Sequence, residues 1–304
     1  SGSAAIHAGM NMIRAGQART VLIVGAEKMT SRSTKEVTQA LAGAGYQNDP
    51  AEASLSFPQV FGVAARDYDA RYGSPLDAMA KIAVKNHANA MSNPLAHMHK
   101  EFTFEHCSTV SEMNPEIAPP LRLTDCSLVT DGAAALILTT EENAATFPKS
   151  VAMRAAAHVN DFLPMSRRDF LAFEGPERAF AQAFKAANVT LDDIDFAEVH
   201  DCFTIAELLT YEAMGLAAKG QGARALEDGT VYRGGALPVN LSGGLKAKGH
   251  PVGATGVSMH ALAFRQLTNQ AGDLQVPGAE LGLLFNMGGS AVANYVSVLE
   301  ARKV

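Results

Sequence analysis

The sequence has little cysteine: its 304 residues include only Cys107, Cys126 and Cys202. An odd, sparse set without C-x-x-C pairs argues against a disulfide framework and against a structural zinc site. Charge is also scarce, because charged residues make up 18% of the chain and the formal net charge is −6. No basic stripe is dense enough to follow a phosphate backbone, so the sequence argues against nucleic acid as a partner.

Long apolar runs are absent as well. No run reaches the length of a membrane span, no signal peptide opens the chain, and the last four residues, ARKV, are not a peroxisomal address. We therefore expect a soluble, cytoplasmic protein of a reducing compartment. In such a compartment each cysteine is either a small buried apolar residue or a reactive thiol.

The sequence does have a high apolar content, 47%, with abundant glycine and alanine. Such a composition is typical of a tightly packed α/β protein with one large domain or two similar halves. A helix, an apolar strand and a glycine-led strand of small residues occur twice, which predicts two related halves. The first copy comprises residues 4–15, 20–25 and 132–138, and the second starts at 253–256 and continues through 281–285 and 288–296.

The first half carries a long insert that the second half lacks. We expect the halves at 1–149 and 150–304, with a polar, loop-rich insert at about 30–130 that contains helical patches at 64–72 and 76–91. The strand before the insert is a continuous apolar run, typical of a strand buried on both faces. A long insert in this place usually shapes a binding site. A cap over the site and a dimerisation arm explain it equally well.

The second half contains a polar cluster at the end of a strand. After a strand beginning near 150 and a helix at 176–187, an apolar strand at 194–199 ends in the tetrapeptide HDCF at 200–203, and a helix from about 204 to 214 follows. In open α/β sheets, ligands bind at this end of the strands. A helix N-terminus lowers the pKa of a nearby thiol, so we expect Cys202 to favour the thiolate. An inert core cysteine is the alternative.

A glycine-rich segment at 240–256 is the second candidate for a site. Its glycines favour a folded loop over a helix or a strand, let the backbone approach a ligand, and lead into a helix N-terminus. His250 lies between a glycine and a proline, so the backbone sets the direction of its ring.

Zinc is an alternative ligand for these two segments together. His200, Asp201, Cys202 and His250 are all residue types that bind zinc. Consecutive residues at a strand end point to opposite sides, however, which argues against three adjacent ligands.

These segments carry a specific resemblance. The GHP tripeptide at 249–251, followed by GATG at 253–256, resembles the GHP motif of thiolases. The HDCF tetrapeptide replaces the NEAF tetrad of ordinary thiolases and is the hallmark of the sterol-carrier-protein-x type. The likeness covers essentially the whole chain and includes 25–29, 83–87, 124–127 and 130–133. The sequence thus resembles the thiolase superfamily, and within it an acetyl-CoA acetyltransferase-like enzyme of that type.

The resemblance implies an α/β fold of two related βαβαβαββ halves in a layered α-β-α-β-α arrangement, with an inserted loop domain and dimers or dimers of dimers built through the central sheets. The first half is truncated in this chain. The family's nucleophilic cysteine falls immediately before Ser1, so we expect the whole protein to carry an N-terminal portion with that cysteine. A relative without thiolytic activity is the alternative.

The resemblance also implies the chemistry. Thiolases transfer an acyl group to a cysteine and condense it with a second acyl-CoA, or run the reverse thiolysis, in lipid metabolism. Coenzyme A is the co-substrate, and no permanently bound cofactor or metal is implied. By position, His250 activates the nucleophile and helps to hold a thioester oxygen, His200 replaces the asparagine of that oxyanion site, and Cys202 is the acid/base cysteine.

Ordinary thiolases place their acid/base cysteine in a C-terminal CxG motif. Here the matching residues are NMG at 286–288, and the thiol of the HDCF segment takes over, while the Gly288 N–H remains an oxyanion donor.

For coenzyme A binding, position suggests four residues of the insert, the HDCF segment and the glycine-rich loop: Phe61, Phe203, Ser242 and Gly243. Core packing explains Phe61 equally well. Lys246 and Lys248 are candidates for the CoA phosphates, or ordinary surface lysines.

Two further functional classes stay open. One is a thiolase-like aldolase or lyase that acts on CoA thioesters without a nucleophilic cysteine, often with a small partner protein, and with Cys202 or Tyr295 as its base. The other is a non-catalytic protein that binds acyl-CoA or lipid.

Overall fold

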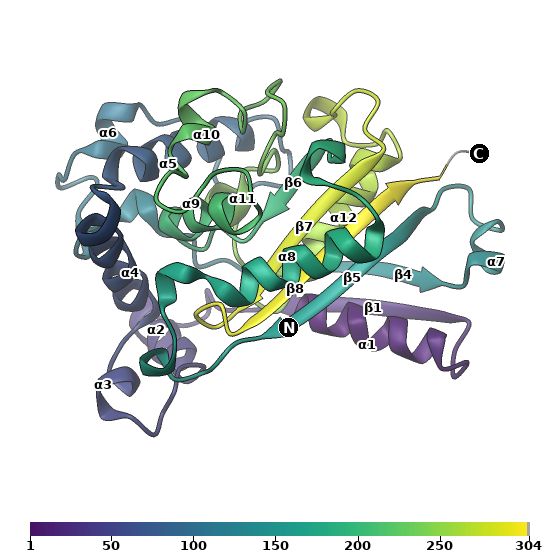
Figure 1. Ribbon diagram of the computed structural model, residues 1–304, viewed down its shortest axis with the longest axis horizontal. Helices are drawn as coiled ribbons and strands as arrows, with labels where there is room; N and C mark the ends of the chain where they lie inside the picture. Colours follow the sequence, from purple (N-terminus) through teal and green to yellow (C-terminus); the bar gives the residue numbers. More distant parts are fainter. Residues whose placement is uncertain (303–304) are drawn as a thin grey trace.

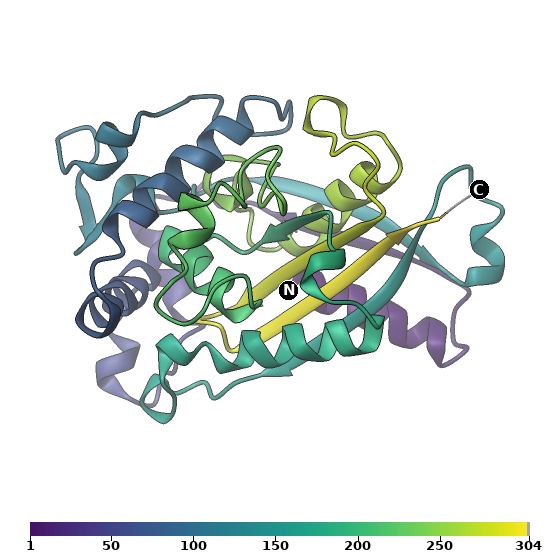
Figure 2. The ribbon, with the colours of Figure 1, turned by 45° about the horizontal axis from the view of Figure 1, so that its top comes forward.

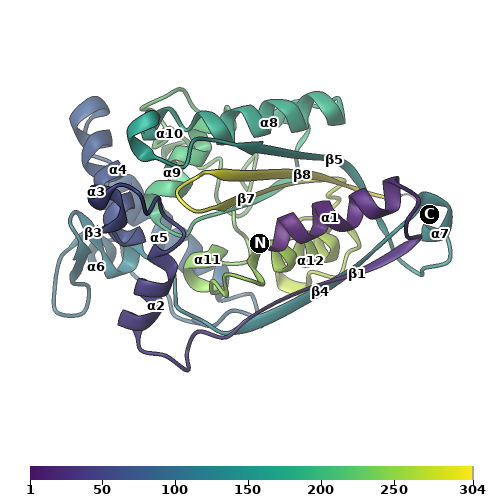
Figure 3. The same cartoon turned by 90° about the horizontal axis from the view of Figure 1, so that it is seen from below.

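The computed structural model describes residues 1–302 and has four layers, which Figures 1 and 3 show from the front and from below. Helix α8 covers a four-stranded sheet of order β5-β8-β7-β6; below this sheet lie α1 and α12, and below them the two-stranded sheet β1–β4. The strands are β1 (Thr20–Glu27), β2 (Glu116–Ala118), β3 (Leu121–Arg122), β4 (Gly132–Thr139), β5 (Val151–Asn160), β6 (Phe196–Val199), β7 (Leu281–Gly288) and β8 (Ala293–Ala301).

The helices include a central pair, α1 and α12, the outer helix α8 and a group inserted between β1 and β4. They are α1 (Gly2–Arg14), α2 (Thr34–Ala42), α3 (Pro50–Ala53), α4 (Phe57–Tyr72), α5 (Leu76–Ala90), α6 (Phe104–Ser108), α7 (Glu141–Ala144), α8 (Glu174–Ala187), α9 (Thr204–Ala213), α10 (Arg224–Glu227), α11 (Gly244–Ala247) and α12 (Thr255–Leu267). Single 3₁₀ turns cover Leu123–Asp125, Met165–Arg167, Phe170–Ala172, Leu191–Asp193 and Gly272–Leu274. No helix of the described chain is both long and apolar enough to cross a membrane.

The predicted recurrence is present as two copies of one motif. In the first copy α1 leads into β1, which pairs antiparallel with β4; in the second, α12 leads into β7, which pairs antiparallel with β8. The two helices lie side by side between the sheets (Figure 3). The second copy has additional neighbours, because β5 pairs with β8 and β6 runs parallel to β7.

The first sheet corrects one prediction. We expected β1 to be buried on both faces, but Leu22 and Val24 are 65% and 59% exposed, while Ile23 between them is buried. The reason is that one face of β1–β4 packs on α1 and α12, whereas no helix of the described residues covers the other face. The opposite strand shows the same alternation, with Ile137 exposed across from Leu22.

The insert packs beside the second half (Figure 2). Its helix α5 contacts both α9, which follows the HDCF segment, and α11, which lies inside the glycine-rich loop. The predicted helix at 64–72 begins earlier, at Phe57, because Ser56 and Gln59 form a capping box and Pro58 occupies the first turn. A helical turn in the glycine-rich loop, α11, was not expected; Gly243 and Gly244 open it with positive φ angles.

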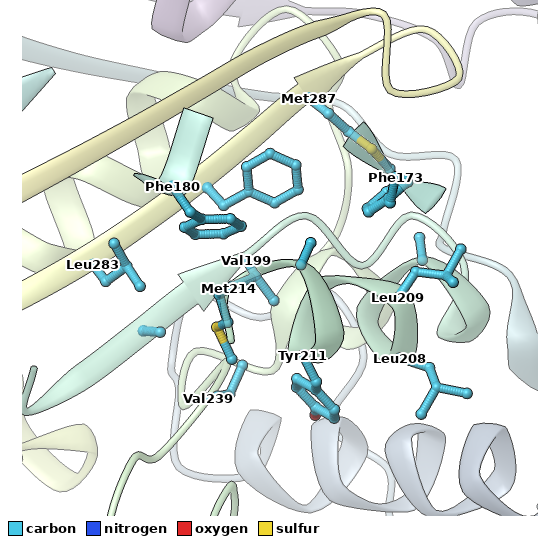
Figure 4. Packing of buried hydrophobic residues seen from close by; sticks show 14 of the residues in the cluster. Phe173, Phe180, Val199, Leu208, Leu209, Tyr211, Met214, Val239, Leu283 and Met287 are labelled. Carbon is cyan, nitrogen blue, oxygen red and sulfur yellow. The ribbon is translucent and has the colours of Figure 1, made fainter. Parts of the chain in front are cut away.

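Most of the core lies in the second half and its contact with the insert. Figure 4 shows part of it, with Phe180 from α8, Leu283 from β7, Val199 from β6 and Tyr211 from α9 in one cluster. A much smaller cluster joins the central helices to the first sheet and consists of Ile6, Met10, Ile23 and Val257. The second half is therefore the larger packing unit.

The central helices meet at their N-termini through glycine. A side chain at Gly2 would meet the backbone nitrogen of Val257 at 2.7 Å, and one at Gly256 would meet the backbone nitrogen of Ser3 at 2.3 Å. Only glycine permits this approach, because any Cβ atom would overlap backbone. The contact brings the starts of α1 and α12 to the same place as the ends of β6 and β7.

Candidate active site

Two imidazoles meet where these elements converge. His200 directly follows β6, and His250 precedes α12 in the glycine-rich loop. Their ring centroids are 5.0 Å apart and their planes are nearly perpendicular, at 87°. The HDCF and GHP segments, about fifty residues apart in the chain, thus contribute neighbouring side chains.

His200 is held by residues of two other elements. Its Nδ1 lies 2.9 Å from Nδ2 of Asn286 in β7, and Oδ1 of the same amide accepts a hydrogen bond of 2.9 Å from Oγ of Ser3 in α1. All three side chains are buried. Burial, followed by the neighbouring His250, holds the pKa of His200 well below its usual value, so the ring is neutral at physiological pH.

His250 is held from its own loop and from the insert. Its Nδ1 lies 2.7 Å from Oγ1 of Thr255, and its backbone N–H donates to Oγ1 of Thr130 at 2.9 Å. Burial, with Lys248 as a further cause, lowers the pKa of His250 to about 3.

Two helix N-termini also point to this place. Backbone N–H groups in the first turn of a helix lack intrahelical partners and carry partial positive charge. Because α1 and α12 start here, their first turns offer donors and a positive potential to an oxygen that gains negative charge. The site is thus suited to stabilising an oxyanion.

Asp201 faces away from the two imidazoles. Its carboxylate accepts from the backbone N–H groups of Leu245 and Lys246, at 2.6 and 3.2 Å, and from Nδ2 of Asn86 at 2.8 Å. Burial, followed by the charge of Glu207, raises the pKa of Asp201. The residue therefore fastens the glycine-rich loop to the HDCF segment.

The contact to Asn86 extends into a buried polar network that ties the insert to the second half. Asn86 also donates to Glu207 at 2.7 Å, and Glu207 forms an ion pair with Lys85 at 3.0 Å. Asn240 donates to the same carboxylate at 2.9 Å. A buried ion pair of this kind is stabilising only while every member keeps its partners.

Cys202 differs from the prediction in its protonation. We expected the start of α9 to lower the pKa of its thiol, but burial, followed by the charge of Asp201, raises that pKa well above the usual value. The thiol is therefore protonated in the resting protein. Its backbone carbonyl accepts from the N–H of Ser127, which links the HDCF segment to the insert. The acid/base role of Cys202 remains a prediction.

The other two cysteines lie in buried or half-buried positions outside the pair of imidazoles. Burial raises the pKa of Cys107 and raises that of Cys126 to about 12. Neither thiol is activated. Within residues 1–302, no three His, Cys, Asp or Glu side chains are grouped so that they could hold a metal ion.

Two of the residues suggested for coenzyme A pack the loop against β6 and α5. Ser242 donates its hydroxyl to Glu198 at 2.6 Å, and a Cβ atom at Gly243 would lie 2.6 Å from Cβ of Ala90. The lysines of the same loop are also buried: Lys246 donates to the carbonyl of Cys126 at 2.6 Å, and Lys248 to Oγ of Ser258 at 3.1 Å. Burial contradicts the suggestion that these lysines meet CoA phosphates or lie on the surface.

The two phenylalanines suggested for coenzyme A stack on each other. Phe61 and Phe203 have centroids 4.6 Å apart, and both are buried. Core packing explains this contact, so their contact with the pantetheine arm stays a prediction. Gly288 ends β7, two residues beyond Asn286 on the same strand, and its role as a donor is likewise a prediction.

Sequence reasoning missed the side chains that hydrogen-bond to the imidazoles, Thr255 and the amide of Asn286, and it missed Ser3, which donates to that amide. The signal for Ser3 was its place in the first turn of a helix, and for Thr255 its place five residues after His250. Tyr295, considered as a base for a lyase, lies opposite Asn286 across β7 and β8. Its ring stacks on His158 with centroids 4.1 Å apart and meets the edge of His7.

The chain is similar to known proteins over nearly its whole length. A family model described as "Thiolase, N-terminal domain" matches residues 1–113, and one described as "Thiolase C-terminal domain-like" matches residues 156–301. An acetyl-CoA acetyltransferase of Methanothermobacter thermautotrophicus is 39% identical over 292 residues, which cover 95% of this chain and 75% of that protein. A sterol carrier protein 2 of Oryctolagus cuniculus is 35% identical and covers 96% of this chain, but the chain spans only 56% of it.

Among solved structures, the Ltp2-ChsH2(DUF35) aldolase superposes with a TM-score of 0.81 and 23% sequence identity, over 100% of this chain and 78% of that chain. This likeness confirms the predicted α/β fold class. The identity to the acetyl-CoA acetyltransferase, along nearly the whole length of this chain, establishes the lineage: the chain belongs to the thiolase family.

Proposed function

We propose that the protein is a CoA-dependent acyltransferase of the thiolase type, which condenses acyl-CoA molecules or cleaves a 3-ketoacyl-CoA with coenzyme A. One observation carries the proposal, namely the perpendicular imidazoles of His200 and His250 at the converging N-termini of α1 and α12. An α-proton of a thioester is weakly acidic, so its removal needs donors aimed at the enolate oxygen. The two helix ends and the imidazoles supply such donors.

His250 has the role of proton acceptor. Its ring is neutral at physiological pH, which leaves it free to take a proton from the nucleophilic thiol of the reaction. Once protonated, it is a donor to the thioester oxygen. His200 donates to the same oxyanion.

Cys202 is assigned the proton transfer at the α-carbon. In thiolysis, the family's nucleophilic cysteine, which we expect before Ser1, gives its proton to His250 and attacks the keto carbon. The carbon–carbon bond then breaks, the acyl group stays on that sulfur until coenzyme A takes it, and the other product leaves as an enolate. The protonated thiol of Cys202 gives its proton to the enolate carbon, and the resulting thiolate is the base for the reverse condensation. A raised thiol pKa supports the donor role.

Coenzyme A is the co-substrate in this proposal, with Phe61, Phe203, Ser242, Gly243 and the Gly288 N–H as the residues assigned to its pantetheine arm and thioester. The protein acts as a homodimer or a dimer of dimers. The substrates are acyl-CoA thioesters of lipid metabolism.

Thiolysis tests the proposal directly. The full-length protein, with the cysteine expected before Ser1, is mixed with a 3-ketoacyl-CoA and free coenzyme A, and loss of the 3-ketoacyl-CoA is followed spectroscopically. His250→Ala and Cys202→Ala are each expected to lose about a hundredfold or more in kcat, because each removes a group that acts in the transition state. Cys107→Ala, outside the site, is the control. Wild-type rates in either site variant, or no thiolysis by the wild-type protein, would overturn the proposal.

The second candidate is a lyase that cleaves a β-hydroxyacyl-CoA without added coenzyme A. The superposition on the Ltp2-ChsH2(DUF35) aldolase favours it, as does the position of Tyr295 across the strand pair from Asn286. In this case Cys202 or Tyr295 is the base, and a small partner protein completes the enzyme. Cleavage of a β-hydroxyacyl-CoA that Tyr295→Phe abolishes, with no thiolysis, would select the lyase. Binding of acyl-CoA with neither reaction would leave a non-catalytic binding protein.

A further inference from the structure

Three buried side chains form a hydrogen-bonded chain that ends at one imidazole. Ser3 in α1, Asn286 in β7 and His200 after β6 are 1%, 6% and 6% exposed, and each of the two contacts is 2.9 Å long. Gly256 makes room for the chain, since a Cβ atom there would lie 2.7 Å from both Asn286 Oδ1 and Ser3 Oγ. With bulk water excluded, these partners alone determine which ring nitrogen carries the proton.

The orientation of the Asn286 amide follows from its surroundings. Its oxygen faces the N-termini of α1 and α12, where partial positive charge favours an oxygen over an NH₂ group. The hydroxyl of Ser3 donates to that oxygen, so the NH₂ group faces His200. An amide nitrogen only donates, and Nδ1 of His200 must therefore accept. The proton of the neutral ring is then on Nε2.

His250 shows the opposite arrangement. The hydroxyl of Thr255 has a single proton, which it donates to the carbonyl oxygen of Pro251 at 3.0 Å. Thr255 therefore accepts from Nδ1–H of His250, and Nε2 of this ring keeps its lone pair. The two neighbouring rings present different nitrogens to the site, one with a proton and one without.

We propose that Asn286, oriented by Ser3, is a positioning residue that holds His200 as its Nε2–H tautomer, so that His200 enters the reaction as a hydrogen-bond donor while His250 enters as an acceptor. The inference rests on the proposed function for its consequence but not for its geometry. It explains how two neutral imidazoles 5.0 Å apart divide the roles of oxyanion donor and proton acceptor without a charge on either.

The tautomer can be observed without any reaction. In protein labelled with ¹⁵N-histidine, long-range ¹H–¹⁵N correlation spectra distinguish a ring protonated at Nε2 from one protonated at Nδ1, and His200→Gln and His250→Gln assign the signals. We expect Nε2–H for His200 and Nδ1–H for His250 in the wild-type protein. A wild-type His200 protonated at Nδ1 would overturn the inference, whatever the activity.

Asn286→Asp tests whether the Asn286 amide determines the tautomer of His200. A carboxylate only accepts, so His200 must carry a proton on Nδ1, and Nε2–H persists only while the ring is a cation. The rate at which acetyl-CoA α-protons exchange with D₂O is measured by mass spectrometry at several pH values. In Asn286→Asp this rate is expected to fall as pH rises, by about a hundredfold at the high-pH end, while KM stays within a few-fold of the wild-type value. A structural role alone would not produce this pH dependence.

Asn160→Asp is the control, because Oδ1 of Asn160 lies 2.9 Å from Nε2 of His158, an imidazole outside the site. It is expected to leave the exchange profile unchanged. An Asn286→Asp profile that parallels the wild type would overturn the inference. The expected spectra in a protein that exchanges no α-protons would instead count against the proposed function and leave the tautomer assignment intact.

Discussion

The two copies of the helix–strand–strand motif have different surroundings. β7 and β8 lie inside a four-stranded sheet with α8 on one face and the central helices on the other, whereas β1 and β4 form a sheet by themselves with one open face. Most of the polar side chains at the candidate site belong to the second half, and the first half supplies Ser3 and the end of α1. One motif thus serves twice to aim a helix N-terminus, in two different surroundings.

The sharpest test of this comparison is one substitution made in both sheets. Leu284 in β7 is 1% exposed, and Leu22 in β1 is mostly exposed. Leu284→Ala is expected to lower the free energy of unfolding by about 2–5 kcal/mol, because it leaves a cavity. Leu22→Ala is expected to change it by no more than about 0.5 kcal/mol. Urea denaturation measures both, and a large loss for Leu22→Ala would show that its face is covered in solution.

The second test compares the contributions of the halves to catalysis. His200→Ala removes an oxyanion donor of the second half and is expected to slow α-proton exchange of acetyl-CoA by about 10²–10³-fold. Ser3→Ala leaves the donor in place and loosens only the orientation of Asn286, so a loss of less than about tenfold is expected. Equal losses in the two variants would show that Ser3, from the first half, contributes to the reaction as much as His200 does.

The third test concerns pH and a buried histidine that links α12 to β8. His260 in α12 is buried, with contacts of 2.7 Å to the Gly256 carbonyl and 2.9 Å to Ser297 Oγ, and burial lowers its pKa to about 4. Unfolding returns it to a pKa of about 6.5, so the unfolded chain binds the extra proton between these values. Stability is therefore full above pH 6.5 and falls by up to about 3 kcal/mol as pH drops towards 4.

His260→Gln removes that titration. Its unfolding free energy, from urea denaturation at several pH values, should fall less steeply between pH 6.5 and 4 than that of the wild type. An identical slope for His260→Gln would contradict the assignment.

The smallest expected effect concerns the contact between the motifs. Gly256→Ala places a Cβ atom 2.3 Å from the backbone nitrogen of Ser3, and we expect a loss of about 1–3 kcal/mol in the free energy of unfolding. Gly45→Ala, whose Cβ atom would have no neighbour closer than 3.3 Å, is the control. Thermal unfolding measures the difference, and equal midpoints would show that the helix ends separate easily.

Periodicity and motifs predicted much of the fold. The expected helices at 4–15, 176–187 and 204–214 correspond to α1, α8 and α9 within two residues at each end, because amphipathic spacing acts locally. The open face of β1 was not predictable, since an apolar run does not tell which of its faces will find a partner. The helical turn α11 was not predicted, because a neighbouring helix, α5, stabilises it.

The candidate site was predictable only in part. The motifs singled out His200 and His250, and the structure places their rings side by side. The predicted direction of the change in the Cys202 pKa was wrong. The sequence shows the helix that follows, but it does not show the burial and the neighbouring carboxylate, which raise this pKa and outweigh the helix. Ser3 and Asn286, 283 residues apart, form a contact that no local pattern encodes.

The glycine contact between α1 and α12 has a consequence for how such proteins diverge. Where side chains meet, a change on one partner is absorbed by a change on the other, and a lineage can drift through many pairs. At Gly2 and Gly256 the nearest neighbours are backbone atoms, which no substitution can shorten. We therefore expect no gradual series of tolerated substitutions at this junction. The far ends of the two 13-residue helices, about 20 Å away, remain free to vary.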